Sequence, residues 1–273
     1  MKAACRQLAA SGKTLGFVPT MGALHEGHLS LVRASKAGCD VTAVSIFVNP
    51  QQFAPHEDLE KYPRPLERDA AMLEALGVEF LFLPTVEEMY PAGAKTHVIV
   101  NDLSAKLDGA SRPTHFRGVT TVVTKLFEIV RPNCAFFGQK DAVQCAVLRQ
   151  MVRDLDMDVE TVVCPIMREP DGLAMSSRNI YLSPEQRQGA LVLHRALMRA
   201  QLAVDRGQRD PAKLVEIGEQ VVAEEPGGRL DYFAVVDPET LEPATDLARG
   251  ALVAVAVYFG NTRLIDNIVL APR

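Results

Sequence analysis

The sequence lacks the features that mark several classes of protein. Its most apolar stretch, Ala251–Phe259, is far shorter than the roughly 20 residues that a membrane-spanning helix needs. No charged and then apolar secretory segment opens the chain. Acidic residues outnumber basic ones by 34 to 29, and the resulting net charge of −5 argues against nucleic-acid binding and against a polybasic membrane anchor.

Cysteine is also scarce. The chain has 5 cysteines, an odd number, with no C-x-x-C pair, and each stands among apolar neighbours. We therefore expect reduced core thiols in a cytoplasmic protein and no disulfide framework. The composition, 48% hydrophobic and 23% charged, is typical of a soluble globular chain and excludes a disordered one. No internal repeat or low-complexity segment is visible.

A length of 273 residues predicts about two domains. We expect the first over residues 1–165, where strand-like and helical segments alternate. The predicted strands are Leu15–Pro19, Val41–Val48, Val78–Leu83, Cys134–Phe137 and Val159–Val163. The predicted helices are His28–Ala37, Pro65–Leu76, Val119–Val130 and Ala142–Leu155. This order indicates right-handed βαβ units in an α/β domain with a Rossmann-like parallel sheet.

Residues 166–273 have a different pattern, and proline and charge interrupt the alternation at Pro165–Pro170. A capping box with proline at the first helical position begins a helix at Ser183, and Asp210-Pro211 begins a second one. Three strand-like runs follow: Leu230–Val236, Leu252–Phe259 and Arg263–Leu270. We expect a smaller α+β domain with an antiparallel sheet and two helices.

The first chemically informative segment is Pro19-Thr-Met-Gly-Ala-Leu-His-Glu-Gly-His28, which runs from a strand end into a helix start. That position offers free N–H groups and a positive dipole end to phosphate. Two histidines three residues apart, His25 and His28, can contact one polyanion. They could instead be plain helix-cap residues, or ligands of zinc. Zinc needs a third ligand, and the remaining histidines stand in no ligand-spaced motif: His56, His97, His115 and His194.

Three further segments follow predicted strands or lie near the domain junction. The amides of Asn49–Phe53 could bind a small polar substrate, or the segment could be a solvated loop. In Phe137–Asp141, Lys140 is placed to neutralise phosphate, and the alternative is a strand end with a surface ion pair. Asp171–Asn179 carries two hydroxyls and an arginine that could close over a triphosphate, where the alternative is a flexible linker.

Taken together with Arg112-Pro-Thr-His-Phe-Arg-Gly-Val-Thr-Thr-Val-Val123, these segments resemble the pantothenate synthetase (pantoate–β-alanine ligase) family. The similarity runs from Gly16 to about Ile268. His-x-Gly-His alone marks only the wider HxGH nucleotidyl-transferase superfamily, whereas the motifs in this order are far more specific. Two alternatives are a nucleotidyltransferase that leaves the nucleotide on its product and a non-catalytic nucleotide-binding regulator. The second is weakened because His28, Lys140 and Arg178 are all present.

The resemblance implies an activity: ATP-dependent condensation of (R)-pantoate with β-alanine through a pantoyl adenylate, giving pantothenate, AMP and pyrophosphate. It also implies Mg²⁺, a homodimer, and a Rossmann-like N-terminal domain followed by a mobile C-terminal lid. The residue chemistry agrees, because attack of a carboxylate on the α-phosphorus needs positioning and charge stabilisation and no enzyme nucleophile.

The resemblance also assigns roles to residues. It implies catalytic roles for His25, His28, Lys140 and Arg178. The implied ATP-binding residues are Met21, Gly22, Ala23, Leu24, His25, Glu26, Gly27, His28, Gly138, Gln139, Lys140, Asp141, Met167, Met175, Ser176, Ser177 and Arg178. Gln52 and Gln144 match pantoate-binding positions, and Gln52 also matches the β-alanine site. Arg112 and Tyr62 align with further active-site positions.

The chain departs from the family pattern at three places. Only Met1–Val18 precede the first motif, so we expect the family's first strand or its start to be missing and a sheet edge to be affected. Thr114 stands where glycine is common, which changes the backbone beside Arg112. Gln139 replaces a frequent acidic residue and removes a possible charge partner of Lys140.

Overall fold

The computed structural model describes residues 1–55 and 57–272; His56, one of the histidines considered for zinc, and Arg273 lie outside the described residues. The chain divides into two compact units. The first contains Met1–Gln139 and Val147–Pro165, and the second contains Lys140–Ala146 and Ile166–Arg273. The short segment 140–146 thus belongs with the second unit, which no pattern in the sequence indicated.

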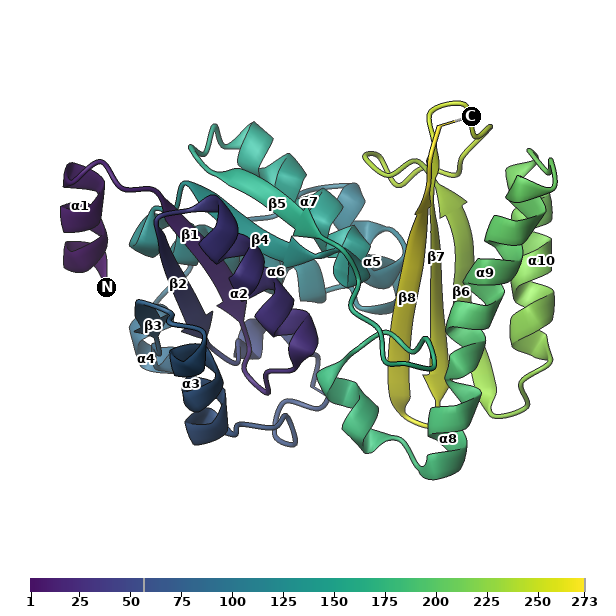
Figure 1. Cartoon of the computed structure of the whole chain (residues 1–273), viewed down its shortest axis with the longest axis horizontal. Helices are drawn as coiled ribbons and strands as arrows, with labels where there is room; N and C mark the ends of the chain where they lie inside the picture. Colours follow the sequence, from purple (N-terminus) through teal and green to yellow (C-terminus); the bar gives the residue numbers. More distant parts are fainter. Residues whose placement is uncertain (56, 273) are drawn as a thin grey trace. The chain divides into compact units, whose positions relative to one another are not determined.

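The first unit is built on a five-stranded sheet in the order β3-β2-β1-β4-β5 (Figure 1). Its strands are β1 (Leu15–Thr20), β2 (Val41–Ile46), β3 (Phe80–Phe82), β4 (Cys134–Gly138) and β5 (Glu160–Cys164). Every neighbouring pair is parallel. The predicted Rossmann-like parallel sheet is therefore confirmed, because this strand order and direction are those of a doubly wound fold.

Two of the predicted strands are shorter than the apolar runs suggested. β2 stops at Ile46, and the chain enters the 3₁₀ turn η1 (Pro50–Gln52) soon afterwards, where proline has no N–H for a ladder. β3 lies at the sheet edge and pairs with β2 through only three residues. Val78, predicted to begin this strand, instead donates its N–H to Leu73 O and closes the preceding helix.

Helices pack on both faces of this sheet. Successive strand residues point to opposite faces, and Phe136 and Phe137 show the consequence. Phe136 joins the buried cluster that contains Leu31 and Val32 of α2 (Glu26–Gly38). Phe137 meets the ring of Phe127 in α6 (His115–Val130) at 6.5 Å. The parallel strands are thereby buried on both sides, as parallel strands generally are.

The remaining helices of the first part of the chain are α1 (Lys2–Ala10), α3 (Leu66–Ala75), α4 (Val86–Met89), α5 (Asp108–Ser111), the 3₁₀ turns η2 (Leu103–Ala105) and η3 (Gln139–Asp141), and α7 (Ala142–Asp154). No prediction included α1. It has no side-chain cap and buries only Cys5, so its sequence gives little helical signal. β1 is an inner strand of the sheet, because it pairs with β2 on one side and with β4 on the other.

The second unit holds a three-stranded antiparallel sheet, as predicted, with β6 (Gly228–Val236), β7 (Ala251–Phe259) and β8 (Thr262–Leu270) in sequential order. In Figure 1, α9 (Leu191–Asp205) and α10 (Pro211–Ala223) lie side by side against this sheet. Gly218 of α10 permits the close approach, since a Cβ there would come within 2.2 Å of the Phe233 ring.

The predicted number of helices in the second unit was wrong. The capping box at Ser183 is present, but the helix that it begins, α8 (Pro184–Gly189), is only 6 residues long. It ends at Gly189, and α9 follows as a separate helix. Glycine disfavours helix interiors, and a Cβ at this position would approach Glu225 and Phe259 to 3.0 and 3.1 Å. The short helix η4 (Ser177–Tyr181) precedes α8.

All five cysteines lie in the described part of the chain and are thiols, not disulfides. Cys5, Cys145 and Cys164 are buried, whereas Cys39 and Cys134 are only half-buried, so the expectation of core thiols holds for three of the five. Within the described ranges, no helix is both long and apolar enough to cross a bilayer.

Candidate active site

The first group of predicted site residues lies at the carboxyl edge of the parallel sheet. β1 and β4 are adjacent, with Gly16 paired to Cys134, although the chain between them forms β2 and β3. The connections from these two strands therefore leave in opposite directions along the sheet, which makes this the point where doubly wound folds bind ligands. β1 runs into the segment Met21–His28, and β4 ends at Gly138, followed by Gln139.

The loop after β1 is held by contacts beneath it. Thr20 Oγ1 donates to Ser45 O at 2.8 Å and accepts from Gly22 N at 3.2 Å. Gly22 has φ +80°, and a Cβ there would come within 2.9 Å of Ile46, so only glycine fits this turn without strain. Asp69 of α3, which is 1% exposed, accepts the N–H of Leu24 at 3.0 Å. The loop is thus fixed before any ligand binds.

His25 and His28 lie at the N-terminus of α2 and cap it. His25 Nδ1 accepts the Gly27 N–H at 3.1 Å, and His28 Nδ1 accepts the His25 N–H at 3.4 Å. The rings lie 4.2 Å apart, centroid to centroid. The helix-cap alternative is therefore correct as a local description, and it has a chemical consequence. With Nδ1 accepting in both rings, each neutral imidazole carries its proton on Nε2, beside the positive end of the helix dipole.

Gln52 is oriented by a chain of side-chain amides. Asn49 Nδ2 donates to Gln52 Oε1 at 3.0 Å and to Gly118 O at 3.0 Å. Tyr90 OH in turn donates to Asn49 Oδ1 at 2.8 Å, and burial raises the pKa of Tyr90 to about 12, so this phenol stays a donor. Because its oxygen is occupied, Gln52 presents its amide nitrogen, which lies 3.0 Å from Met21 Sδ. Gln52 and the loop after β1 therefore lie together.

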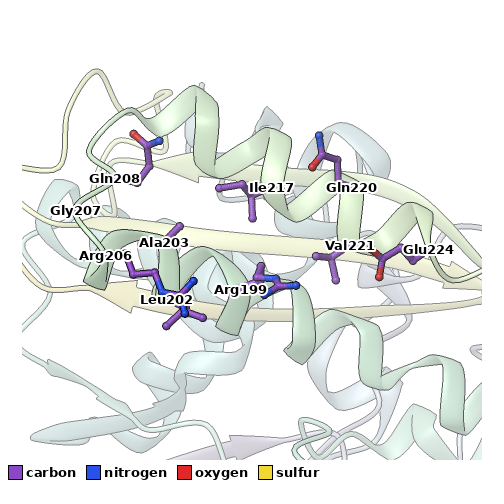
Figure 2. A pocket seen from close by; sticks show the side chains of 10 residues that line it. All are labelled: Arg199, Leu202, Ala203, Arg206, Gly207, Gln208, Ile217, Gln220, Val221 and Glu224. Carbon is purple, nitrogen blue, oxygen red and sulfur yellow. The ribbon is translucent and has the colours of Figure 1, made fainter.

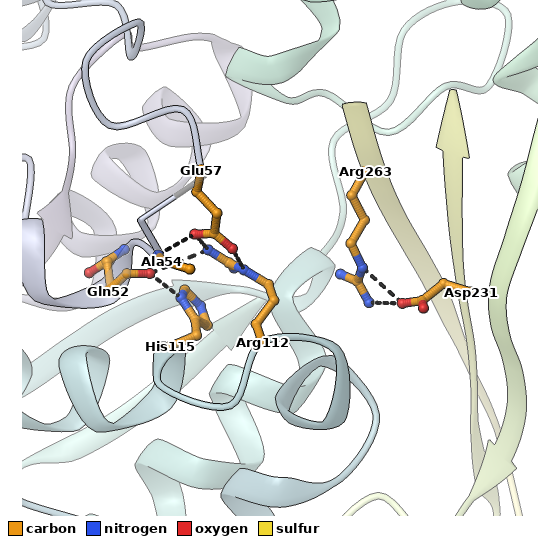
Figure 3. A network of polar contacts seen from close by, with 7 residues as sticks. All are labelled: Gln52, Ala54, Glu57, Arg112, His115, Asp231 and Arg263. Atoms are coloured by element: carbon orange, nitrogen blue, oxygen red, sulfur yellow. Dashed lines mark hydrogen bonds and ion pairs between the residues drawn. The ribbon is translucent and has the colours of Figure 1, made fainter. Parts of the chain in front are cut away.

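Arg112 is committed to an ion pair in the first unit (Figure 3). Its Nε and Nη2 donate to the two carboxylate oxygens of Glu57 at 2.6 and 2.7 Å. Burial opposes ionisation of Glu57, but the hydrogen bonds and charge of Arg112 outweigh it and lower the pKa of that carboxyl.

His115 Nδ1 lies 2.9 Å from Gln52 O. Tyr62 is buried and packs edge-on against Phe53 at 5.9 Å. Figure 3 also shows a pair in the second unit, Arg263 donating to Asp231.

The second group of predicted residues lies in the second unit. Met175 N donates to Met167 O at 2.9 Å, which closes a tight hairpin over residues 167–175. Gly172 has φ +98° at its tip, and a Cβ there would come within 2.4 Å of the His194 ring. Arg187 pairs with Glu169 and Asp171 at 2.6 and 2.9 Å. The segment considered as a flexible linker is thus a braced hairpin that leads into η4.

After the hairpin, the Ser176 hydroxyl accepts the N–H of Arg178 at 3.3 Å and caps η4. One small pocket is lined by β8 residues together with Lys140, Leu173, Ala174, Ser176 and Asn179. Lys140 Nζ lies 3.7 Å from Asp141 Oδ1, the surface ion pair considered above, and Gln144 is half-buried on α7. Lys140 and the segment that begins with Met175 are therefore neighbours within this unit.

Another pocket of the second unit contains none of the predicted residues. It measures about 580 Å³ and lies along α9 and α10 (Figure 2). Its lining is Arg199, Leu202, Ala203, Arg206, Gly207, Gln208, Ile217, Gln220, Val221 and Glu224. None of its lining residues belongs to a motif of the candidate site.

Within residues 1–55 and 57–272, no cluster of three histidine, cysteine or acidic side chains is placed to hold a metal ion.

Comparison with known proteins is consistent with this arrangement. The pantoate–β-alanine ligase family model matches residues 1–269. The pantothenate synthetase of Koribacter versatilis is 62% identical over 270 residues, 99% of this chain and 93% of its own length. The chain belongs to the pantoate–β-alanine ligase family. The resemblance identified from the sequence motifs is thereby confirmed.

Solved structures of family members agree in fold. Pantothenate synthetase from Thermus thermophilus is 49% identical and superposes with a TM-score of 0.93, covering 98% of each chain. Pantoate–β-alanine ligase from Francisella tularensis, solved in complex with β,γ-ATP and β-alanine, is 33% identical with a TM-score of 0.78. It covers 97% of this chain and 95% of its own. The two-part fold is therefore the ligase fold over nearly its whole length.

Several residues that support the site carried no local signal in the sequence. Each of them forms a hydrogen bond with a residue about 40 to 130 positions away in the chain: Asp69, Tyr90, Arg168, Asp266 and Asn267. Asp266 and Asn267 belonged to a run predicted only as a strand. The one available sign was that a carboxylate and an amide stand next to each other in an otherwise apolar strand. Such groups are buried only when they are hydrogen-bonded, so partners elsewhere in the chain could have been expected.

Proposed function

We propose that this ligase-family chain condenses (R)-pantoate with β-alanine at the expense of ATP, through a pantoyl adenylate, giving pantothenate, AMP and pyrophosphate. The observation that carries the proposal is the match to the pantoate–β-alanine ligase family over residues 1–269. Within that match, His25 and His28 lie at the N-terminus of α2, at the point where the sheet order reverses. A helix N-terminus and two ring donors suit a polyphosphate. The Francisella tularensis ligase, solved with β,γ-ATP and β-alanine, supports the choice of substrates.

In the first half-reaction, a pantoate carboxylate oxygen attacks the α-phosphorus of ATP, and the bond to pyrophosphate breaks. Negative charge builds on the phosphoryl oxygens and on the leaving group, so preorganised donors accelerate the step. In the first unit, His25 and His28 donate through Nε2. In the second unit, Lys140 and Arg178 supply positive charge. In the second half-reaction, the β-alanine amine attacks the acyl carbon, AMP leaves, and the amine loses a proton.

We assign nucleotide contacts to the residues that the motifs indicate. In the first unit these are Met21, Gly22, Ala23, Leu24, His25, Glu26, Gly27, His28, Gly138 and Gln139. In the second unit they are Lys140, Asp141, Met167, Met175, Ser176, Ser177 and Arg178. The hydrogen bond from Met175 N to Met167 O holds these two residues side by side in the hairpin, which supports assigning both to the same nucleotide.

Gln52 and Gln144 are assigned to pantoate, and Gln52 also to β-alanine. The orientation of Gln52 supports this, because Asn49 occupies its amide oxygen and its amide nitrogen remains directed toward Met21. An N–H₂ group suits the carboxylate or hydroxyl oxygens of both substrates. Arg112 is a weaker candidate for substrate contact than its motif suggests, since Glu57 occupies two of its donors.

The wider assignments are also proposals. Mg²⁺ would arrive with ATP and be held mainly by phosphate oxygens and water, since the described residues offer no dedicated cluster of ligands. The enzyme would act as a homodimer in the cytoplasm, where its five thiols remain reduced. The unit that contains residues 1–139 and 147–165 would bind nucleotide and pantoate, and the unit that contains residues 140–146 and 166–273, which also carries Lys140 and Gln144, would be the C-terminal lid.

The test is exchange of labelled pyrophosphate into ATP in the absence of β-alanine. Exchange that requires pantoate is expected, and it would establish the reversible adenylate half-reaction. Addition of β-alanine should then release AMP and pantothenate in equal amounts. A folded, ATP-binding protein that shows no pantoate-dependent exchange would refute the proposal. A product that retains the nucleotide would instead indicate a nucleotidyltransferase.

A further inference from the structure

Strand β8 carries two adjacent buried polar residues, Asp266 and Asn267, which are 3% and 2% exposed. Buried polar groups in an otherwise apolar strand need hydrogen-bond partners, and these two find theirs in segments about 100 and 130 residues earlier in the chain. Both partner segments lie in the second unit, and each contains a residue assigned above to the nucleotide, Met167 in one and Lys140 in the other. Neither Asp266 nor Asn267 belongs to those assignments.

Asp266 fixes the base of the Met167–Met175 hairpin through Arg168. Its two carboxylate oxygens accept from the two terminal nitrogens of Arg168 at 2.6 and 2.9 Å. The same guanidinium donates to Gly172 O at 3.1 Å, inside the hairpin turn. A bidentate, charge-assisted pair sets direction as well as distance. The hairpin that leads to Ser176 and Arg178 is therefore tied to β8 at a buried point.

Asn267 fixes the backbone at Lys140. Its side-chain Nδ2 donates to Lys140 O at 2.9 Å. The adjacent residue, Asp266, lines the same small pocket as Lys140, Ser176 and Asn179. β8 therefore contacts both segments of the second unit to which we assign cationic and hydroxyl donors. The Arg168–Asp266 pair is neutral overall, so this support adds no net charge near those donors.

We infer that Asp266 and Asn267 are positioning residues for the adenylation step, acting through Lys140 and through the hairpin that precedes Ser176–Arg178. The inference rests on the proposed function, because it takes these segments to bind the triphosphate. Neither Asp266 nor Asn267 contacts the substrate in this proposal. Their effect would arise because small displacements of preorganised donors weaken their interaction with the developing charge.

The test compares Asn267→Leu with Asn261→Leu in pyrophosphate exchange. Leucine has the same number of side-chain heavy atoms as asparagine and the same branching at Cγ, but no donor. Asn261 is an exposed residue outside β8 and outside the proposed site. For Asn267→Leu we expect kcat/KM for ATP to fall about three- to tenfold, the effect of one lost neutral hydrogen bond. The KM for pantoate should stay within about twofold of wild type. A purely structural defect would lower the active fraction and leave both KM values unchanged.

Asp266→Asn provides the second variant, because it keeps the shape of the side chain and removes its charge. It should show the same selective effect on ATP, and it keeps the inference testable if Asn267→Leu does not fold. Wild-type ATP parameters in a folded Asn267→Leu or Asp266→Asn enzyme would overturn the inference. So would equal loss for pantoate and ATP. Absence of exchange in the wild-type enzyme would instead refute the proposed function, so the two failures can be told apart.

Discussion

The two units hold their candidate functional groups in different ways. In the first unit, His25 and His28 are oriented by backbone N–H groups within three residues of themselves. In the second unit, Lys140 and the hairpin before Arg178 depend on Asp266 and Asn267, about a hundred residues away. A short motif can therefore specify the first arrangement almost alone, whereas the second exists only after the β-sheet of its unit has formed.

The largest expected effect tests the local arrangement. His28→Ala removes one preorganised donor, so the rate of pantoate-dependent pyrophosphate exchange should fall by roughly 10²–10³. The matched control is His97→Ala, at an exposed position outside the proposed site, which should leave the rate unchanged. Near-normal exchange by a folded His28→Ala enzyme would exclude the catalytic role of His28.

A second experiment tests the packing that braces the hairpin of the second unit. Gly172→Ala places a Cβ 2.4 Å from His194 at φ +98°, whereas Gly207→Ala has φ +99° and open space around its Cβ. Both variants carry the left-handed backbone penalty of about 1–2 kcal/mol. Only Gly172→Ala should lose a further 1–3 kcal/mol or so from overpacking. Urea denaturation measures both, and equal losses would show that His194 moves aside without cost.

The third experiment asks whether the first unit also depends on distant residues. Tyr90→Phe removes the donor to Asn49, which loosens the orientation of Gln52. Loss of one hydrogen bond of about 1 kcal/mol should raise the KM for pantoate about fivefold. The KM for ATP should not change. Tyr258→Phe, in the second unit, keeps the ring that lies under Arg229 and serves as control. A change in the ATP parameters alone would contradict the assignment of Gln52 to pantoate.

The smallest effect concerns pH. Burial, and then the positive charge of Arg168, lower the pKa of His194 in the folded chain. The unfolded chain therefore binds this proton more readily, and the free energy of unfolding should decrease as pH falls through the ordinary value near 6.5. The decrease ends once the folded form is protonated as well. His194→Asn should flatten this pH dependence in denaturation experiments. The exposed His97→Asn should not, and an unchanged profile for His194→Asn would refute the prediction.

The prediction of the fold succeeded where local signals were strong. The apolar spacing along Val119–Val130 and the proline-capped start at Pro211 both correspond to helices of the structure. It failed where the signal was weak or ambiguous. α1 has no cap and one buried residue, and Gly189 divided what the Ser183 capping box predicted as one helix. The roles assigned to the site residues stay predictions until the enzymatic tests are made.

The sequence by itself determined the alternation of strands and helices, the family motifs and the family to which the chain belongs. It did so because these depend on residue periodicity, on turn residues and on short motifs. Only the tertiary structure decided that Lys140 belongs with the second unit, that Tyr90 orients Gln52 through Asn49, and that Asp266 holds Arg168. The last two depend on hydrogen bonds between polar groups that are distant in sequence. Any of several polar residues could satisfy such groups, and the packing of the sheet selects the ones that meet.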